Sequence, residues 1–262
     1  MNRRWCSRRI KTRPGQRGAV VKVPLNGGTP ITLAALGGYP MGLAVDATNV
    51  YLTTTTGCVF SSTGHLGYEL MSIPVDGGTP TRLISELSSD ASAHGVAIDN
   101  ANIYWSYVEL PAGICHLSRT EPMLGGKILK LPLGGGTPTV LASGFSQPLS
   151  VVVDGTNVYF TDNIGYTVMS VPIAGGLPTT LAKSTDGNEP FVIAVDANHV
   201  YWTHGGQGAE IRRVPLGGGT PTIVASGLNY PNALVIDTTS IYWTESCSVC
   251  PGSGSVMKLR VH

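Results

Sequence analysis

Charged residues are scarce in this chain, at 13% of its 262 residues, and aromatic residues make up only 7%. Long apolar runs are missing as well, since no stretch approaches the roughly 18 consecutive residues that a bilayer-spanning helix needs. A membrane span is therefore excluded. Low charge does not indicate disorder here, because hydrophobic residues reach 42% and disordered chains combine high charge with low hydrophobicity. The composition predicts a folded globular body.

The first 18 residues lack acidic side chains and hold seven of the 17 basic ones. We interpret residues 1–18 as a basic, unstructured N-terminal extension and residues 19–262 as one domain. No apolar segment follows the arginines, so this chain contains no predicted signal peptide. The ten remaining basic residues are outnumbered by all 16 acids, which leaves the body with a net charge of −6. This argues against a nucleic-acid partner, because phosphate contacts need a basic surface.

Glycine and proline, in contrast, are frequent, with 34 and 18 residues. They recur in a unit in which an apolar run ends at an aspartate and a tyrosine follows five residues later. The five aspartates are Asp46, Asp99, Asp154, Asp196 and Asp237. Their spacings of 53, 55, 42 and 41 residues, with four strand-like segments in each unit, predict an all-β fold of the β-propeller type.

The unit over residues 126–162 illustrates the four strands. Its first strand, 128–133, stops at three glycines, which supply the positive φ of a tight turn. The strand 137–141 contains a proline, which suits the outer edge of a sheet because proline donates no ladder hydrogen bond. The run 149–153 is apolar on both faces, as in a buried strand, and 158–162 is aromatic and β-branched. From the centre outward we name them A (149–153), B (158–162), C (128–133) and D (137–141).

The aspartate after each A strand is expected to form the A–B turn rather than to act in catalysis. Aspartate at the first position of a turn accepts a hydrogen bond from the backbone two residues further on. The constant spacing of this residue from unit to unit agrees with a local structural role.

The B strands carry a recognisable motif. They include Val200-Tyr201-Trp202-Thr203, Ile241-Tyr242-Trp243-Thr244, Ile103-Tyr104-Trp105-Ser106 and Val158-Tyr159-Phe160-Thr161-Asp162. With the LAVD and GGTP segments in register, the chain from Ala19 onward resembles the YWTD propellers of low-density-lipoprotein receptors and their bacterial relatives, and borders on NHL and TolB-like propellers. The family's final aspartate is present as Asp162, whereas the other units have Thr54, Tyr107, His204 and Glu245. The resemblance implies a propeller in an extracytoplasmic or secreted bacterial setting.

Five A strands favour five four-stranded blades. The ring would then close by pairing of the N-terminal strand with the C-terminal strand, which leaves no long free edge. One strand is in excess, however, because residues 20–24 and 256–261 are both C-type. An incomplete six-bladed propeller without its N-terminal inner strands is the alternative.

The two faces of such a propeller differ in sequence. The A–B and C–D turns are short and constant, whereas the B–C and D–A loops vary, and recognition residues usually lie on variable loops. We therefore predict a non-catalytic binding or scaffold module that engages a protein segment or a glycan through the B–C/D–A face. The predicted ligand-binding residues at this channel mouth are Tyr39, Met41, His94, Gln147, Glu189, Phe191, Tyr230 and Asn232.

Two other functions stay open from the sequence. A metal-assisted hydrolase or lyase would use His94, Glu189, His204 and Asn232, and its cofactor would be Zn²⁺ or Ca²⁺. The acid and amide oxygens at the mouth are too few for a full calcium shell, so the leading prediction has no cofactor. A purely structural module is the third possibility.

Four of the five cysteines fall in predicted B–C loops, on one face. They are Cys58, Cys115, Cys247 and Cys250. The CxxC pair Cys247 and Cys250 is a candidate disulfide, the four thiols together are a candidate zinc site, and unpaired thiols are the third reading.

Overall fold

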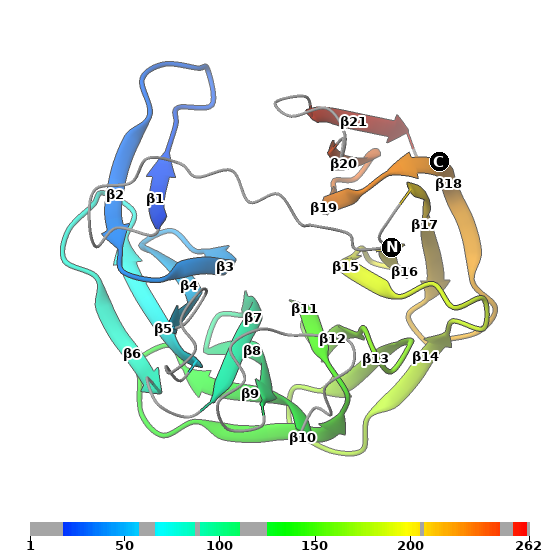
Figure 1. Ribbon diagram of the computed structural model, residues 1–262, viewed down its shortest axis with the longest axis horizontal. Coiled ribbons are helices and arrows are strands. Elements are labelled where there is room, and N and C mark those ends of the chain that lie inside the picture. The colour runs from blue at the N-terminus through cyan, green and yellow to red at the C-terminus, as the bar shows by residue number, and fades with distance from the viewer. Residues whose placement is uncertain are drawn as a thin grey trace.

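The computed structural model describes residues 18–57, 66–86, 90–110, 125–204, 207–246 and 254–260. These residues form 21 β-strands and no helix, arranged as radial sheets around a centre (Figure 1). The prediction of an all-β propeller is confirmed. Within these ranges there is no helix of the length and apolar character that crossing a membrane requires.

Four of the sheets are complete blades, in which four antiparallel strands follow one another from the centre outward. Blade one contains β3 (Tyr39–Val45), β4 (Asn49–Gly57), β5 (Leu66–Pro74) and β6 (Thr81–Glu86). Blade two contains β7 (Ala91–Ile98), β8 (Asn102–Glu109), β9 (Gly125–Pro132) and β10 (Thr139–Phe145). Blade three contains β11 (Pro148–Val153), β12 (Asn157–Asp162), β13 (Thr167–Pro172) and β14 (Thr179–Lys183). Blade four contains β15 (Pro190–Val195), β16 (His199–His204), β17 (Gln207–Pro215) and β18 (Thr222–Asn229). The predicted order A-B-C-D is therefore correct.

Two smaller sheets complete the described part of the chain. Blade five has three strands, β19 (Pro231–Ile236), β20 (Ser240–Ser246) and β21 (Gly254–Arg260), and the hairpin of β1 (Gly18–Lys22) and β2 (Ile31–Leu36) is separate. Five inner strands, one from each blade, surround the centre, so the prediction of five blades is confirmed. The hairpin adds a sixth sheet of C- and D-type strands without inner strands, the arrangement that the six-bladed alternative described.

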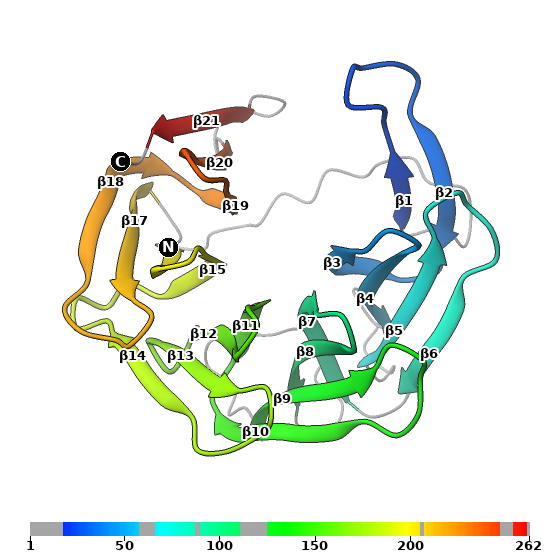
Figure 2. The same ribbon diagram turned by 180° about the vertical axis from the view of Figure 1, so that it is seen from behind.

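The predicted closure by terminal strands is wrong for the described residues. There β1 pairs only with β2, and β21 pairs only with β20. Seen from both sides, β1 and β21 lie on opposite sides of an opening in the ring (Figures 1 and 2). The reason is that both are C-type strands, and in a complete blade a C strand pairs with a B strand and a D strand, never with another C strand.

The short turns form as the residue types predict. In the turn between β9 and β10, the amide of Gly135 donates to the carbonyl of Pro132 at 2.9 Å. Gly135 and Gly136 have φ angles of 84° and 129°, a region that side chains disfavour. Glycine is therefore required at this turn by conformation and not by any ligand.

The aspartate turns also form as predicted, with one addition. Asp154 Oδ1 accepts hydrogen bonds from the amides of Thr156 and Asn157, each at 2.6 Å, and its Oδ2 accepts one from the Tyr159 hydroxyl at 2.8 Å. The other four units repeat this pattern. The tyrosine five residues after each aspartate is thus the second half of a turn cap.

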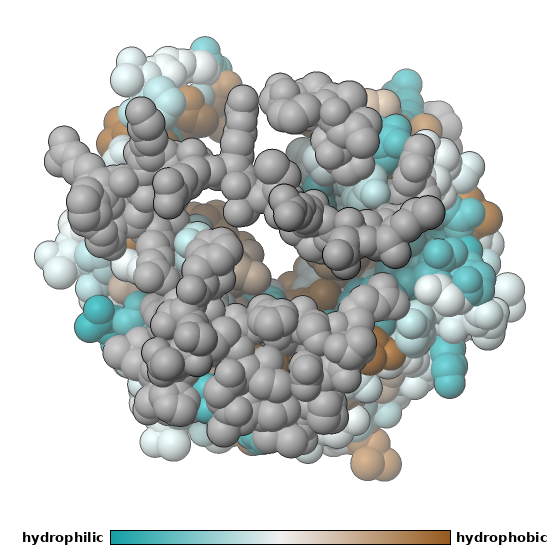
Figure 3. All heavy atoms as spheres, in the orientation of Figure 1, coloured by the Kyte–Doolittle hydropathy of each residue, from teal (hydrophilic) through white to brown (hydrophobic). Residues whose placement is uncertain are grey.

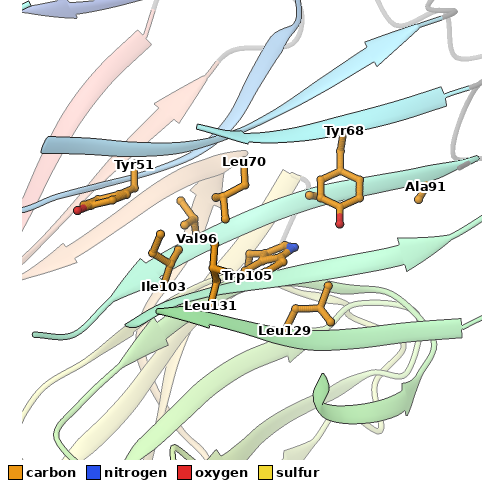
Figure 4. Close-up of a cluster of buried hydrophobic side chains, with 10 residues drawn as sticks. Tyr51, Tyr68, Leu70, Ala91, Val96, Ile103, Trp105, Leu129 and Leu131 are labelled. Atoms are coloured by element: carbon orange, nitrogen blue, oxygen red, sulfur yellow. The ribbon is translucent and has the colours of Figure 1, made fainter. Parts of the chain in front are cut away.

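The core lies between neighbouring blades. Between blades one and two, Tyr51 and Leu70 from one sheet face Ile103, Trp105 and Leu131 from the other (Figure 4). The side chains of Leu70, Ile103, Trp105 and Leu131 are completely buried. Since burial of apolar surface is the main stabilising contribution to folding, each blade depends on the neighbour against which it packs.

Candidate functional site

The inner strands β3, β7, β11, β15 and β19 surround a central channel of about 740 Å³. This volume is in the range of small-ligand pockets. Its walls are mainly apolar, with residues such as Leu43, Val96 and Val151, while His94, Ser150 and Asn232 are polar. The channel opening is visible at the centre of the space-filling view, with brown apolar residues at its wall (Figure 3).

Four of the predicted ligand-binding residues line this channel, and Leu149 occupies the same position in blade three. The four are Met41, His94, Phe191 and Asn232. Met41 and Phe191 are exposed over 49% and 40% of their surface. Two large apolar side chains therefore meet solvent at the mouth, from blades one and four.

Hydrogen bonds between blades hold the mouth residues in place. The Thr53 hydroxyl of β4 donates to the carbonyl of His94 at 2.5 Å, the Ser106 hydroxyl of β8 to that of Leu149 at 2.6 Å, and the Thr161 hydroxyl of β12 to that of Phe191 at 2.9 Å. The threonine position of the YWTD motif, which is Ser106 in blade two, thus fixes the inner strand of the next blade. This role was not predicted, although the Thr or Ser recurs at a constant position of the repeat.

Glycine allows the inner strands of the first three blades to approach closely. A Cβ atom on Gly42 would lie 2.4 Å from the carbonyl oxygen of His94, and one on Gly95 would lie 2.5 Å from that of Leu149. Both distances are shorter than any van der Waals contact, and both involve backbone, which cannot swing away. The positions of His94 and Leu149 therefore depend on the missing side chains at 42 and 95.

His94 is the polar mouth residue with the most unusual environment. Its Nε2 atom is buried and has no hydrogen-bond partner in the described part of the chain. Burial lowers the pKa of His94 to about 4, because removal from water disfavours the charged imidazolium. The ring is therefore neutral at pH 7.

Asn232 lies in blade five on the other side of the mouth. Its Nδ2 donates to the hydroxyl of Ser246 at 2.8 Å, and that hydroxyl donates weakly to the carbonyl of Tyr230 at 3.5 Å. Tyr230 has a φ of 46°, a left-handed conformation that non-glycine residues adopt rarely. This small network orients the side-chain amide of Asn232.

The remaining predicted ligand-binding residues are not among those lining the channel. Gln147 is buried, and its backbone amide donates to Asp162 Oδ1 at 2.6 Å. Tyr39 is partly exposed at the start of β3, and Glu189 is half-buried in the loop before β15. The structure thus brings four of the eight predicted residues together at the channel and leaves the other four outside its lining.

The position of the family's final aspartate has one role in blade three and another in blades four and five. In blade three, Asp162 accepts hydrogen bonds from the amides of Ser146 and Gln147 in the preceding D–A loop. In blade four, His204 Nε2 accepts one from the Trp202 indole at 3.1 Å. In blade five, Glu245 accepts one from the Trp243 indole at 3.0 Å. Sequence alone could not predict the indole contacts, because they depend on the side-chain conformations of residues two positions apart.

His204 is buried in β16, away from the channel lining. Burial lowers its pKa, and the charge of Arg212 lowers it further. Arg212 itself donates to Glu210 Oε2 at 2.7 Å and to Asp186 Oδ2 at 2.5 Å. His204 and the channel residue His94 belong to blades four and two, so the two histidines of the hydrolase prediction occupy separate environments.

On the opposite face of the propeller, the carboxylates of the aspartate turns are occupied by hydrogen bonds of their own turns. Backbone hydrogen bonds from Thr48 and Asn49 lower the pKa of Asp46, and hydrogen bonds from Thr239 and Tyr242 lower that of Asp237 to about 2. These carboxylates are therefore ionised at pH 7, and their oxygens are already occupied by the turn.

The cysteine predictions, Cys58, Cys115, Cys247 and Cys250, lie outside the described residues. Within the described ranges, no group of three or more His, Cys, Asp or Glu side chains is arranged to hold a metal ion. The disulfide, zinc and free-thiol readings stay predictions.

Comparison with known proteins places the chain among propellers by fold. No protein-family model and no curated protein matches it. Among solved structures, it is similar to a chain of the nidogen/laminin complex (22% identity, TM-score 0.62, 88% of this chain and 83% of that one). It is also similar to the calcium-binding protein regucalcin from Agrobacterium tumefaciens (17%, 0.60, 86% and 73%) and to TolB from Acinetobacter baumannii (12%, 0.60, 94% and 58%). At these identities the likeness shows the fold alone.

Proposed function

We propose that this propeller is a non-catalytic binding module that holds a segment of a protein partner at the channel mouth. The observation that carries the proposal is the contrast between the two faces. On one face the turn carboxylates are saturated by their own hydrogen bonds. On the other, exposed Met41 and Phe191 stand over an apolar channel, and recognition sites combine apolar pockets with a few fixed polar groups.

The chemistry of the mouth favours a peptide with an apolar side chain. Such a side chain would enter between Met41 and Phe191, and the peptide backbone would find a donor in Asn232 Nδ2 and an acceptor in the neutral ring of His94. A glycan would need several aromatic rings for stacking, and of Tyr39, Phe191 and Tyr230 only Phe191 lines the channel. The outer residue Glu189, which is half-buried in the loop before β15, would then contact a flank of the segment.

One neighbour by fold supports a protein partner in general. It is part of a complex between two proteins, nidogen and laminin. An extracytoplasmic location, which the YWTD resemblance implies, is part of the same proposal. It would place the mouth among surface or secreted partners.

A binding screen tests the proposal directly. The protein is offered to a displayed peptide library and to a glycan array, and selected ligands are titrated against three variants. Met41→Ala and Phe191→Ala should each weaken peptide binding at least about tenfold, as loss of a buried apolar anchor does. The control is Leu177→Ala, since Leu177 is 90% exposed in a C–D turn on the opposite face.

Three results would contradict the proposal. They are selective binding of glycans only, binding that depends on Leu177 but on neither mouth residue, and hydrolytic activity that requires added Zn²⁺ or Ca²⁺ and is lost in His94→Gln. The third result would favour the metal-assisted enzyme with His94, Glu189, His204 and Asn232.

A further inference from the structure

His204, the last residue of β16, is a titratable group inside the fold, since only 2% of its surface is exposed. Its Nε2 atom accepts a hydrogen bond from the Trp202 indole at 3.1 Å. The ring is therefore neutral in this arrangement, because a protonated imidazole has only donors. At the same position of blade five, Glu245 accepts the equivalent hydrogen bond. A carboxylate keeps this ability at a pH where histidine loses it, so the contact in blade four is the acid-sensitive one.

The charged and titratable groups around His204 and Trp202 come from β17, from the D–A loop of residues 184–189 and from blade three. They are Glu210 and Arg212 of β17, Asp186 of the loop, and Tyr166 and Lys183 of blade three. Arg212 connects the two acids, since its guanidinium donates to Glu210 Oε2 at 2.7 Å and to Asp186 Oδ2 at 2.5 Å. The loop is thus tied to β17 by an ion pair next to the buried histidine.

The middle of the loop 184–189 is exposed and is attached through Asp186. The two ends of the loop are fixed by hydrogen bonds to blade three, whereas residues 185–188 are exposed. Within this exposed part, Asp186 Oδ1 accepts a hydrogen bond from the amide of Asn188 at 3.1 Å, while its Oδ2 accepts the one from Arg212. Loss of the Arg212–Asp186 pair would therefore free the middle of the loop while both ends stay fixed.

Acid favours conformations in which His204 is exposed. Burial lowers its pKa from the ordinary 6.5, the charge of Arg212 lowers it further, and Asp186, Glu210 and the backbone of Asn188 act in the opposite direction. The contribution of the buried neutral ring to stability is therefore complete above a pH of about 6.5 and is lost as the pH falls through the lowered pKa. Because Asp186 and Asn188 are neighbours of the ring, movement of their loop can expose it without separating any strands.

We propose that His204 is a pH-sensitive switch that releases the loop 184–189 from blade four in mildly acidic surroundings. The protonated ring cannot accept the hydrogen bond of the Trp202 indole, and its new Nε2–H competes with Arg212 for nearby carboxylates. The loop then moves away, and water reaches the charged ring.

The switch lies next to the mouth, because Glu189 and Pro190 join the loop to Phe191. It requires no ligand, however, and neither does its test. Failure of the proposed peptide binding would therefore leave the exchange results below unchanged, and the reverse also holds.

Hydrogen exchange of the loop amides tests the switch. Wild type and His204→Gln are compared at about pH 7.5 and about pH 5, a range in which histidine titrates and glutamine does not. Glutamine can still accept the indole hydrogen bond. Comparing the two proteins at the same pH cancels the effect of pH on intrinsic exchange. For residues 184–189, the ratio of the wild-type rate to the variant rate should rise at least about threefold from the higher pH to the lower.

Asp186→Asn is a second variant that leaves the buried ring in place. Its side chain is 35% exposed, so the fold should tolerate the change, which circular dichroism checks. Loss of the charge weakens the attachment to Arg212, so the loop should exchange faster than in wild type already at about pH 7.5. The matched control is Asp76→Asn, because Asp76 is also ion-paired, to Lys22, but is 92% exposed in a turn of blade one. It should leave the loop unchanged.

Three results would overturn the proposal. The first is a ratio of wild-type to His204→Gln rates that does not change with pH. The second is an equal acceleration of exchange in all blades at low pH, because acid would then destabilise the whole propeller and not one loop. The third is loop exchange in Asp186→Asn that equals that of wild type at about pH 7.5.

Discussion

The interior junctions of the propeller and its two ends present the same residues in opposite environments. At the interior junctions, the inner and third strands are covered from both sides, and Val96, Ile128 and Val151 are buried. At the ends, Leu43 and Val256 occupy the same positions of the repeat and lie in solvent. The difference teaches that burial here is decided by the neighbouring blade and not by the residue type.

This difference has consequences for stability. In repeat folds, the stability of a unit is approximately its own contribution plus that of its interfaces with neighbours. Blades two, three and four have two such interfaces, whereas blade five has one among the described residues. We therefore expect a substitution in an interior blade to lower the free energy of unfolding by more than the same substitution at either end.

The largest effect should come from matched truncations of the third strand. Ile128→Ala in blade two removes a fully buried side chain and should lower the free energy of unfolding by about 2 to 5 kcal/mol. Val256→Ala at the same position of blade five should change it by less than about 0.5 kcal/mol. Urea unfolding of both variants measures this difference. Equal losses would mean that Val256 is covered in solution.

A smaller loss is expected where inner strands touch through glycine. Gly95→Ala places a Cβ atom 2.5 Å from the Leu149 carbonyl oxygen, and such overpacking costs about 1 to 3 kcal/mol. The control is Gly155→Ala, since a Cβ atom at Gly155 would meet nothing within 4 Å. Equal melting temperatures of the two variants would contradict the close packing of β7 against β11.

The hydrogen bonds that Thr and Ser hydroxyls form between blades should contribute less to the free energy of unfolding than the glycine contacts do. Thr161→Val removes the donor to the Phe191 carbonyl and should cost about 1 kcal/mol. Thr244→Val is the comparison, because blade five is followed by no further inner strand in the part of the chain that the structure describes. Its cost should be smaller in the same unfolding assay. A greater cost for Thr244→Val than for Thr161→Val would reverse the comparison.

The smallest effect concerns alkaline pH. Burial, with the hydrogen bond to Asp154 as the second cause, raises the pKa of Tyr159 to about 12, whereas an unfolded tyrosine titrates near 10. The contribution of Tyr159 to the free energy of unfolding is therefore complete below pH 10 and is lost as the pH rises through about 12.

The test compares wild type with Tyr159→Phe over this pH range. The wild type should be more stable by about 0.5 to 1 kcal/mol at pH 7, and its advantage should shrink between pH 10 and pH 12. An advantage that is constant over this range would show that the Tyr159 hydroxyl ionises without penalty. Tyr242→Phe should have a smaller effect at pH 7, because Tyr242 at the end of the series is only half-buried.

Much of the fold could be predicted because the turns and strands of each repeat unit depend on residues that are close together in the sequence. The aspartate turns follow from the hydrogen bonds that an aspartate side chain forms with the backbone that follows it. The prediction that the D strand 137–141 contains Pro138 is wrong, because β10 begins at Thr139 and the proline belongs to the turn before it. The positions of Met41, His94 and Phe191 in the channel lining also follow, since each lies five residues before the turn aspartate of its unit.

The remaining features depend on contacts between distant parts of the chain. The closure prediction failed because pairing β1 with β21 required compatibility between two C-type strands, which no single unit contains. The bridge from Thr161 to the Phe191 carbonyl joins residues in different blades. The neutral state of His94 depends on burial by its surroundings, which the sequence around position 94 does not specify.

The turn cap formed by Asp154 and Tyr159 also bears on how such a chain can grow. Every polar atom of the cap finds its partner within the same hairpin. A duplicated unit can therefore form its turn cap from its own residues, and no residue of a neighbouring unit has to change. This self-sufficiency allows blade number to change by gene duplication, while the loops of the opposite face diverge from copy to copy.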